Sequence, residues 1–398
     1  STTGCGYTNG GTFSAISKTS AELKTKSTFT NSGWDFTEET INGTNDYWII
    51  DATKNNGYPY LSWQSYTVTW DGTAWSPSTP TASDNVIING NYSDAGITCN
   101  DLTINSGFQV TFSSNVSVGG NLLVKTGATL INEGTITVTG TTTVQQAVTG
   151  TGDATPDGRF WYVSSPVSGA KSSSIKTGST RLWYYDEPAH AYSEIDNGTT
   201  DLTVGKGYVC RVGVDQNLAY QGTLNDGDIN LSLSREGTTD EKRGYNLIGN
   251  PYLSYMDWEA AYGSINRQNI SSTVWVRTEN NGTMVFTTYN AVSKTGTLDM
   301  TKNIAPMQGF WVKVEGDGNS GALTFTNAMR GHESGIIKSD EEKELVRLTV
   351  SNGKNSDEAV AVFAEGASNG YDTFDSPKMS NNNADIPEIY MTAGKERV

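Results

Sequence analysis

The stretch from residue 97 to residue 144 decides the fold, because apolar residues recur in it at a fixed interval. The repeat consists of ITCNDLTINSGFQV (97–110), VSVGGNLLVKTGATL (116–130) and then Ile136, Val138 and Val144. Apolar positions return 19 to 20 residues apart, and Gly107 returns as Gly127. Alternating apolar residues interrupted by Asn, Gly and Ser are typical of stacked β-solenoid coils that bury their inner faces against one another. The sequence therefore predicts a short β-helix over residues 65–150.

The cysteines fit this interpretation and argue against thiol chemistry. Cys99 falls on an inward-facing position of the repeat, so we expect a small buried hydrophobe rather than a reactive thiol. The other two cysteines are Cys5 and Cys210. Three widely spaced cysteines build neither a disulfide scaffold nor a CxxC metal clip.

Residues 156–330 contain a second duplication. Three pairs of segments match: YVSSP (162–166) with LIGNP (247–251), TRLW (180–183) with STVW (272–275), and GYVCRV (207–212) with GFWVKV (309–314). The offsets are 85, 92 and 102 residues, which grow as expected if the loops of the second copy are longer. Each copy offers the same series of short strands, so the two are predicted to pack as halves of a β-sandwich.

The remaining segments complete an all-β chain. The charged run within residues 331–344 predicts a linker. Two alternating strands around Asn352-Gly353 then open residues 345–398, which we expect to be a further, incomplete β-sandwich at the start of a sorting-associated region. Because the chain opens at Ser1 without a methionine or a signal-peptide pattern, we expect a processed form or a fragment.

Residues 1–64 carry aromatic motifs beside Gly and Pro. They include STF (27–29), GWDF (33–36) and NGYPYLSW (56–63). This segment resembles the last part of the glycine-rich β-solenoid arrays of bacterial surface adhesins, the hemagglutinin-like and GLUG-repeat families. The resemblance implies the end of a β-solenoid repeat array, with these side chains in its core or cap: Trp34, Phe36, Tyr58, Tyr60 and Trp63.

A second resemblance rests on motifs between residues 249 and 390 and, together with the first, touches most of the chain. Its motifs are GNPY (249–252), DW (257–258), IAPMQGFWV (304–312) and the stretches 371–378 and 387–390. In this order they resemble the C-terminal region of large secreted Bacteroidetes proteins, whose modules precede a sorting domain for the type IX secretion system. The resemblance implies a secreted or outer-membrane-associated adhesin, including the gliding-motility type. Its implied partners are the type IX secretion and anchoring machinery and an extracellular surface or polysaccharide.

Composition excludes several classes of function. Twenty-seven basic against 43 acidic side chains give a net charge of -16, so nucleic acid and anionic membrane surfaces are repelled. The longest apolar run spans only residues 359–364, far below the roughly 18 residues of a membrane-spanning helix. We therefore expect no nucleic-acid partner and no transmembrane segment.

Several motifs of enzymes occur without the context that their chemistry needs. GDGNSG (316–321) matches GxGxxG, but a strand follows it instead of a helix, which predicts a hairpin loop. GASNG (366–370) matches GxSxG, but no helix follows, so its serine is predicted to be a loop serine. His190 is expected to be a structural residue in a turn, and His332 falls in the predicted linker.

Acidic residues are the remaining candidates for catalysis or metal binding. Asp84, Asp94 and Asp101 lie on or near the coils, where a glycosidase or lyase would need carboxylates. However, Lys125 is the only basic residue between positions 65 and 158. NDGD (225–228) is a turn signature. Its two carboxylates could also bind a structural calcium ion, although the full calcium-binding loop is absent. We therefore assign no catalytic, cofactor-binding or metal-ligating residue.

Aromatic residues line one face of the predicted strands in both copies. Trp183 and Tyr185 alternate in the first copy, and Trp275 matches Trp183 in the second. Such rings can stack on sugars, but their repetition favours packing in the core. The sequence thus predicts a non-enzymatic adhesin or its stalk. The alternatives are a polysaccharide-acting enzyme or carbohydrate-binding module on a β-helix scaffold, and a chain captured as cargo of its own export machinery.

Overall fold

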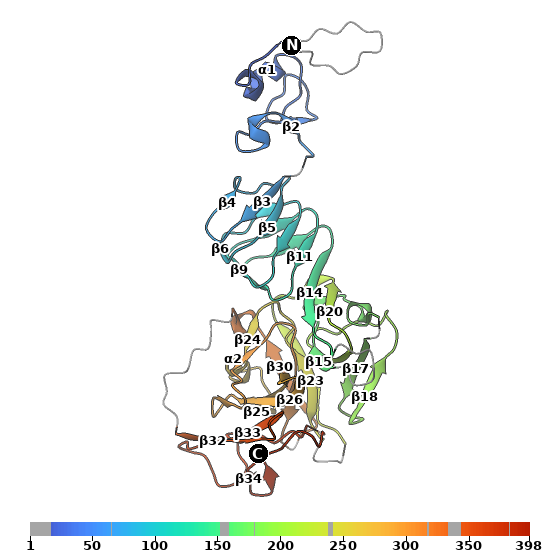
Figure 1. Cartoon of the computed structure of the whole chain (residues 1–398), viewed down its shortest axis with the longest axis vertical. Coiled ribbons are helices and arrows are strands. Elements are labelled where there is room, and N and C mark those ends of the chain that lie inside the picture. Colours follow the sequence, from blue (N-terminus) through green and yellow to red (C-terminus); the bar gives the residue numbers. More distant parts are fainter. Residues whose placement is uncertain are drawn as a thin grey trace.

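The computed structural model is nearly all-β, with 6% helix and 43% strand, which confirms the predicted class. It describes residues 17–64, 66–151, 159–178, 180–237, 242–316, 318–332, 344–381 and 383–398. From the N-terminus, the chain forms a small irregular unit, a solenoid, and a wider lower part in which the rest of the chain gathers (Figure 1). No helix of the described ranges is long and apolar enough to cross a membrane.

Residues 17–64 form a small unit with little regular structure. Its elements are η1 (Glu22–Lys24), α1 (Lys26–Thr30), η2 (Asn55–Gly57) and the antiparallel strands β1 (Trp48–Ile49) and β2 (Tyr60–Leu61). Phe36 and Tyr60 are buried, whereas Trp63 is 64% exposed and is therefore not part of a core. The ring centroids of Trp34 and Trp48 are 4.4 Å apart. Its assignment to the end of a repeat array stays a prediction.

The solenoid has about four turns and three parallel strand stacks. One stack contains β3 (Thr67–Trp70), β5 (Asn85–Ile88), β8 (Leu102–Ile104), β11 (Leu122–Val124) and β14 (Thr142–Val148), with β4 (Trp75–Ser76) antiparallel at its edge. The others contain β7 (Thr98–Cys99), β10 (Val116–Val118) and β13 (Ile136–Val138), and β6 (Tyr92–Asp94), β9 (Gln109–Phe112) and β12 (Thr129–Asn132). Leu122 pairs with Leu102 and with Thr142, so the predicted coil length is confirmed.

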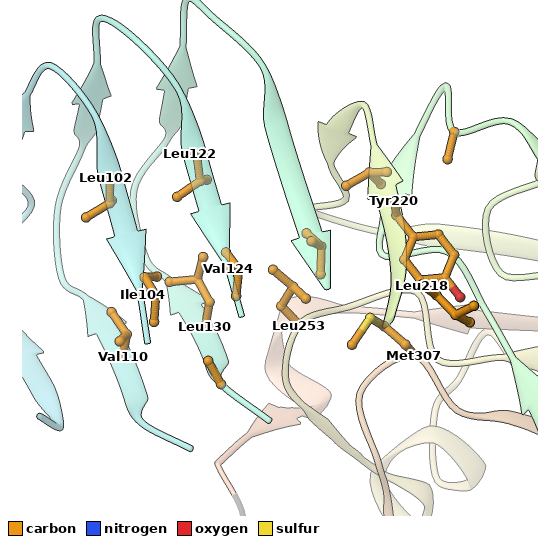
Figure 2. Packing of buried hydrophobic residues seen from close by; sticks show 14 of the residues in the cluster. Leu102, Ile104, Val110, Leu122, Val124, Leu130, Leu218, Tyr220, Leu253 and Met307 are labelled. Atoms are coloured by element: carbon orange, nitrogen blue, oxygen red, sulfur yellow. The ribbon is translucent and has the colours of Figure 1, made fainter. Parts of the chain in front are cut away.

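Side chains at matching positions of successive coils stack inside the solenoid (Figure 2). Leu102 lies beside Leu122, and Ile104 lies beside Val124. All four are almost completely buried. The paired glycines Gly107 and Gly127 both adopt positive φ, 80° and 78°, in the turns that follow. Glycine tolerates this conformation without strain, which explains why the repeat keeps it.

The duplication in the lower part is confirmed by strand order. The first copy uses β15 (Arg159–Val163), β16 (Val167–Ser168), β17 (Arg181–Asp186), β18 (Ala191–Ile195), β19 (Tyr208–Val212), β20 (Gln216–Gln221) and β21 (Thr223–Leu224), with η3 (Ser172–Ser174). The second copy uses β22 (Ile229–Ser234), β23 (Tyr245–Gly249), β24 (Tyr255–Asp257), α2 (Trp258–Tyr262), β25 (Ile270–Asn280), β26 (Thr283–Asn290), β27 (Thr295–Gly296), β28 (Asn303–Ile304), β29 (Gly309–Val314), β30 (Ser320–Phe325), η4 (Asn327–Met329) and β31 (Arg330–Gly331). Their main sheets run β15-β19-β17-β18 and β23-β29-β25-β26-β27.

The two copies contact each other through equivalent backbone groups. The Ser164 N–H donates to the Met307 carbonyl at 2.8 Å, and the Gly249 N–H donates to the Gly205 carbonyl at 2.9 Å. Gly249 follows Ser164 by 85 residues and Met307 follows Gly205 by 102, the offsets of the duplication. An interface in which each copy offers the same groups to the other is isologous. The copies are therefore related by a pseudo-twofold axis.

Strand β14 belongs to the solenoid and to the first copy at once. It pairs in parallel with β11 and antiparallel with β20. In the second copy β22 pairs antiparallel with β30, as β14 does with β20. Strand β14 is therefore the first strand of copy one, and the duplication starts before residue 156. Solenoid residues share one hydrophobic core with Leu218 and Tyr220 of copy one and with Leu253 and Met307 of copy two (Figure 2).

The last segment packs on the second copy. Strands β32 (Leu345–Ser351) and β33 (Ser356–Val362) form the predicted hairpin around Asn352-Gly353, and β34 (Thr392–Ala393) and β35 (Glu396–Arg397) form a shorter one. Between the two hairpins, the described chain has no regular strand and crosses the sheet of copy two. The indole N–H of Trp275 donates to the Pro377 carbonyl there at 2.9 Å.

Candidate functional site

Asp84, the first candidate carboxylate, is a structural residue. It is completely buried, and its oxygens lie 2.6 and 2.5 Å from the ammonium of Lys54. It also accepts hydrogen bonds from the backbone N–H and hydroxyl of Thr81. A buried charge needs such partners, and here they join the N-terminal unit to the first coil.

The other two solenoid carboxylates each have a local partner. Asp94 accepts from the backbone N–H of Ala95 at 2.7 Å, at the end of β6. Asp101 accepts from the backbone N–H of Asn121 at 2.6 Å, one coil further on. Asp101 therefore fixes one coil to the next. Among the described residues, no group of three or more His, Cys, Asp or Glu side chains is placed to hold a metal ion.

The NDGD turn lies where the solenoid meets the module. Asp226 pairs with Arg330 at 2.9 Å and accepts from the amide of Asn132 in β12. Asn225 donates to the carbonyls of Ser165 and Pro251, one from each copy. The turn therefore connects the solenoid and both copies.

The histidines have structural partners too, and one prediction about them is wrong. His190 has φ 51° and its Nε2 is 3.0 Å from the Glu236 carbonyl oxygen, as a turn histidine would be. His332, in contrast, does not lie in a free linker. Its ring nitrogens contact the hydroxyls of Thr111 at 2.8 Å and Thr129 at 2.6 Å, on neighbouring solenoid strands. The charged run of the predicted linker, 338–343, lies outside the described residues.

The two motif matches are loops. GDGNSG connects β29 to β30, but these strands are not paired with each other, so the predicted hairpin is wrong. The reason is that β30 leaves the main sheet and pairs with β22. In GASNG, the Ser368 hydroxyl donates to the Gly370 carbonyl within its own bend. That serine is a loop serine, as predicted.

The aromatic residues form a packed cluster with a cavity at one side. Trp275 is completely buried, and Trp183 and Tyr185 pack against the same cluster, which supports core packing. A cavity of about 370 Å³ opens beside Trp183. It is lined by Phe160, Tyr162, Trp183, Tyr192, Val209, Arg277, Phe286 and Asn381. Sequence reasoning missed Arg277, although its position two residues after Trp275 places it on the same strand face.

A comparison with protein families matches one family over most of the chain. The family is described as a domain of unknown function, DUF8693, and its model matches residues 62–397. The chain belongs to the DUF8693 family. The matched range of the DUF8693 chain contains the solenoid, both copies and the C-terminal hairpins. No curated protein and no solved structure matches the chain.

Acidification is expected to destabilise the DUF8693 chain through His332. Burial, followed by the charge of Arg330, lowers the pKa of His332 below its ordinary value of 6.5. The unfolded chain therefore binds this proton first as the pH falls. The contribution of neutral His332 to the free energy of unfolding is intact above about pH 6.5 and is lost progressively below it. Melting temperatures measured from neutral pH to about pH 5 will show the loss.

The matched variant His332→Asn isolates this effect, because acidic groups that titrate at lower pH are common to both proteins. We expect the melting temperature of the variant to fall less over the same pH range. Equal slopes for the two proteins would show that His332 does not couple protonation to folding.

The two described cysteines of the DUF8693 chain are expected to resist alkylation. Burial raises the pKa of Cys99 to about 12 and that of Cys210 to about 12, and both are free thiols. Because the thiolate is the reactive form, iodoacetamide at about pH 8 will leave both unmodified until denaturant is added. Peptide mass spectrometry measures each site separately. Labelling of either cysteine in the native chain would contradict its burial.

Proposed function

We propose that this chain is the stalk region of a non-enzymatic adhesin that is exported by the type IX secretion system and acts in surface adhesion or gliding. The observation that carries the proposal is that β14 is a strand of both the solenoid and the first copy. This strand has parallel neighbours in the solenoid and an antiparallel neighbour in the module. A load on one part therefore reaches the other through paired strands rather than through a flexible linker.

The junction is built like the interior of a domain. Strand β14 makes six registered pairs with β20, and the hydrophobic core continues across the boundary. Arg330 adds a hydrogen bond from its guanidinium to the Leu130 carbonyl, and the Leu130 N–H donates to the Leu253 carbonyl at 2.6 Å. Domains joined by small polar interfaces are expected to move relative to each other, whereas a shared core opposes such motion. A rigid connection is what a stalk requires.

The candidate carboxylates also support a structural function. Asp84, Asp101 and Asp226 each bind groups that hold separate parts of the fold together. A general acid or base in a glycosidase needs its carboxyl group directed at substrate, with a second carboxyl group across a groove. Here the carboxyl groups are directed at backbone N–H groups and at cationic side chains of the protein itself.

The motifs of the second resemblance have a structural explanation. Asn250 of GNPY is completely buried, and its amide donates to the carbonyls of Ser254, Ile304 and Ala305. The Tyr252 hydroxyl donates to the Gly227 carbonyl. The bonds from Asn250 to Ile304 and Ala305 join the GNPY and IAPMQGFWV segments, and the bond from Tyr252 joins GNPY to the NDGD turn. The proposed export route rests on the resemblance of these motifs to secreted Bacteroidetes proteins.

Location and activity can be tested separately. Protease treatment of intact cells that make the protein is expected to digest it, and inactivating their type IX translocon is expected to retain it inside. The purified chain is expected neither to bind nor to cleave a panel of polysaccharides. If the chain cleaves a polysaccharide and Asp94→Asn or Asp101→Asn abolishes that cleavage, the chain is an enzyme and the proposed stalk function is wrong. Retention inside untreated cells would overturn the proposed location.

A further inference from the structure

Trp183 and Trp275 occupy equivalent places in the two copies. Trp183 pairs with Val209, and Trp275 pairs with Trp311, which follows Val209 by 102 residues. Each tryptophan also packs against an aromatic ring two strands away in the sheet order, across β19 in copy one and across β29 in copy two. The ring centroids are 6.0 Å apart for Trp183 and Phe160, and 5.3 Å apart for Trp275 and Tyr245. The copies thus present the same aromatic platform twice.

In the second copy this platform is covered by the chain's own C-terminal segment. The Trp275 indole N–H donates to the Pro377 carbonyl at 2.9 Å, and Met379 packs against the aromatic cluster. The Thr273 hydroxyl is 2.9 Å from the Ser376 hydroxyl, on the same segment. Residues 373–379 therefore lie on the sheet, with a turn at residues 373–374 and no regular secondary structure after it.

In the first copy no part of the described chain covers the platform in this way. The cavity of about 370 Å³ opens beside Trp183 instead. The Trp183 indole N–H, unlike that of Trp275, has no hydrogen-bond partner within the described ranges. The lining is mostly aromatic, with Phe160, Tyr162 and Tyr192 among its rings. Such a site suits an apolar side chain better than a strongly hydrated ligand.

One cationic group faces the same cavity. The Arg277 guanidinium lies 5.4 Å from the ring centroid of Phe286 and 6.0 Å from that of Tyr162. Its Nε is buried without a hydrogen-bond partner, and none of the described acidic residues forms an ion pair with it. A buried donor without a partner is costly, and a carboxylate from a ligand would satisfy it. The cavity therefore favours a ligand with both an apolar and an acidic group.

We propose that this cavity binds an extended peptide segment of a partner protein, with an acidic residue close to an apolar one. The bound peptide places its apolar side chain among the rings, accepts a hydrogen bond from the Trp183 indole N–H at a backbone carbonyl and pairs its carboxylate with Arg277. The segment that covers copy two also has an acidic residue close to an apolar one, since Asp375 precedes Pro377 by two residues. This site goes beyond the proposed stalk function, which does not depend on it.

The probe is a synthetic peptide with the sequence YDTFDSPKMS, residues 371–380 of this chain. A second peptide carries Asn in place of its two Asp residues. Both are titrated into the full chain by calorimetry. We expect saturable binding of the acidic peptide that weakens at least tenfold in Trp183→Ala. In Arg277→Gln we expect the affinity for the acidic peptide to fall and the affinity for the neutral peptide to remain unchanged.

Matched controls separate binding from folding. Trp63→Ala removes an exposed tryptophan outside the module and is expected to bind like the unmodified chain. A photoreactive group on the peptide is expected to crosslink within β15 to β19, which distinguishes this cavity from displacement of the chain's own segment on copy two. Absence of binding, equal binding in Trp183→Ala, crosslinks confined to copy two, or saturation by neutral oligosaccharides instead of peptide would overturn the proposal.

Discussion

Leu218→Ala is expected to destabilise the solenoid as well as the module that contains Leu218. This side chain is completely buried on β20 and belongs to the core that includes Leu122 and Val124 of the solenoid. Removing a buried leucine side chain costs about 2–5 kcal/mol through lost burial and the cavity left behind. Chemical denaturation followed by circular dichroism measures the total loss of unfolding free energy.

Ala219→Ser provides the matched control for this variant. Ala219 is the next residue of β20 and is exposed, so its replacement is expected to change the unfolding free energy by less than about 0.5 kcal/mol. If Leu218→Ala lowers the stability of the module and leaves the solenoid strands unaffected, the two parts do not share a core in solution.

Lys54→Ala is expected to release the N-terminal unit from the solenoid. The side chains of Lys54 and Asp84 are 2% and 1% exposed, so the variant leaves an uncompensated carboxylate in the interior. Breaking a buried ion pair in this way costs about 3–5 kcal/mol, more than the pair contributes as a net interaction. Limited proteolysis is expected to cleave near residue 65 faster in the variant than in the unmodified chain.

Two further variants identify the cause. Lys18→Ala removes an exposed lysine that pairs with Glu22 at the surface, and it is expected to have almost no effect. The double variant Lys54→Met, Asp84→Leu removes both charges and is expected to recover most of the lost stability. If the double variant is as unstable as Lys54→Ala, lost packing and not the unpaired charge explains the effect.

The solenoid was predictable because its information is local and repeated. Each coil needs only its neighbours 20 residues away, and the apolar pattern of Ile104, Val124 and Val144 records that spacing directly. The duplication was predictable for a similar reason, since Trp183 and Trp275 keep equivalent partners. A repeated pattern of this kind can be recognised in the sequence even where individual strands have only three residues.

The junctions were not predictable from the same patterns. The pairing of β14 with β20 joins residues more than 60 positions apart, and the sequence of β14 continues the solenoid repeat without a sign of a second partner. His332 sits beside a charged run, which conceals its contact with Thr111 and Thr129. The cavity beside Trp183 arises only when Arg277 and Asn381 are brought to it by the packing of separate segments.

Native-state hydrogen exchange tests the central claim, that the solenoid and the first copy form one rigid unit through β14. Backbone amides of β11 and β20 are compared in the unmodified chain and in Leu218→Ala. A shared cooperative unit predicts that the opening free energies of both strands fall together by the amount lost in global unfolding. A fall confined to β20, with β11 unchanged, would contradict the account.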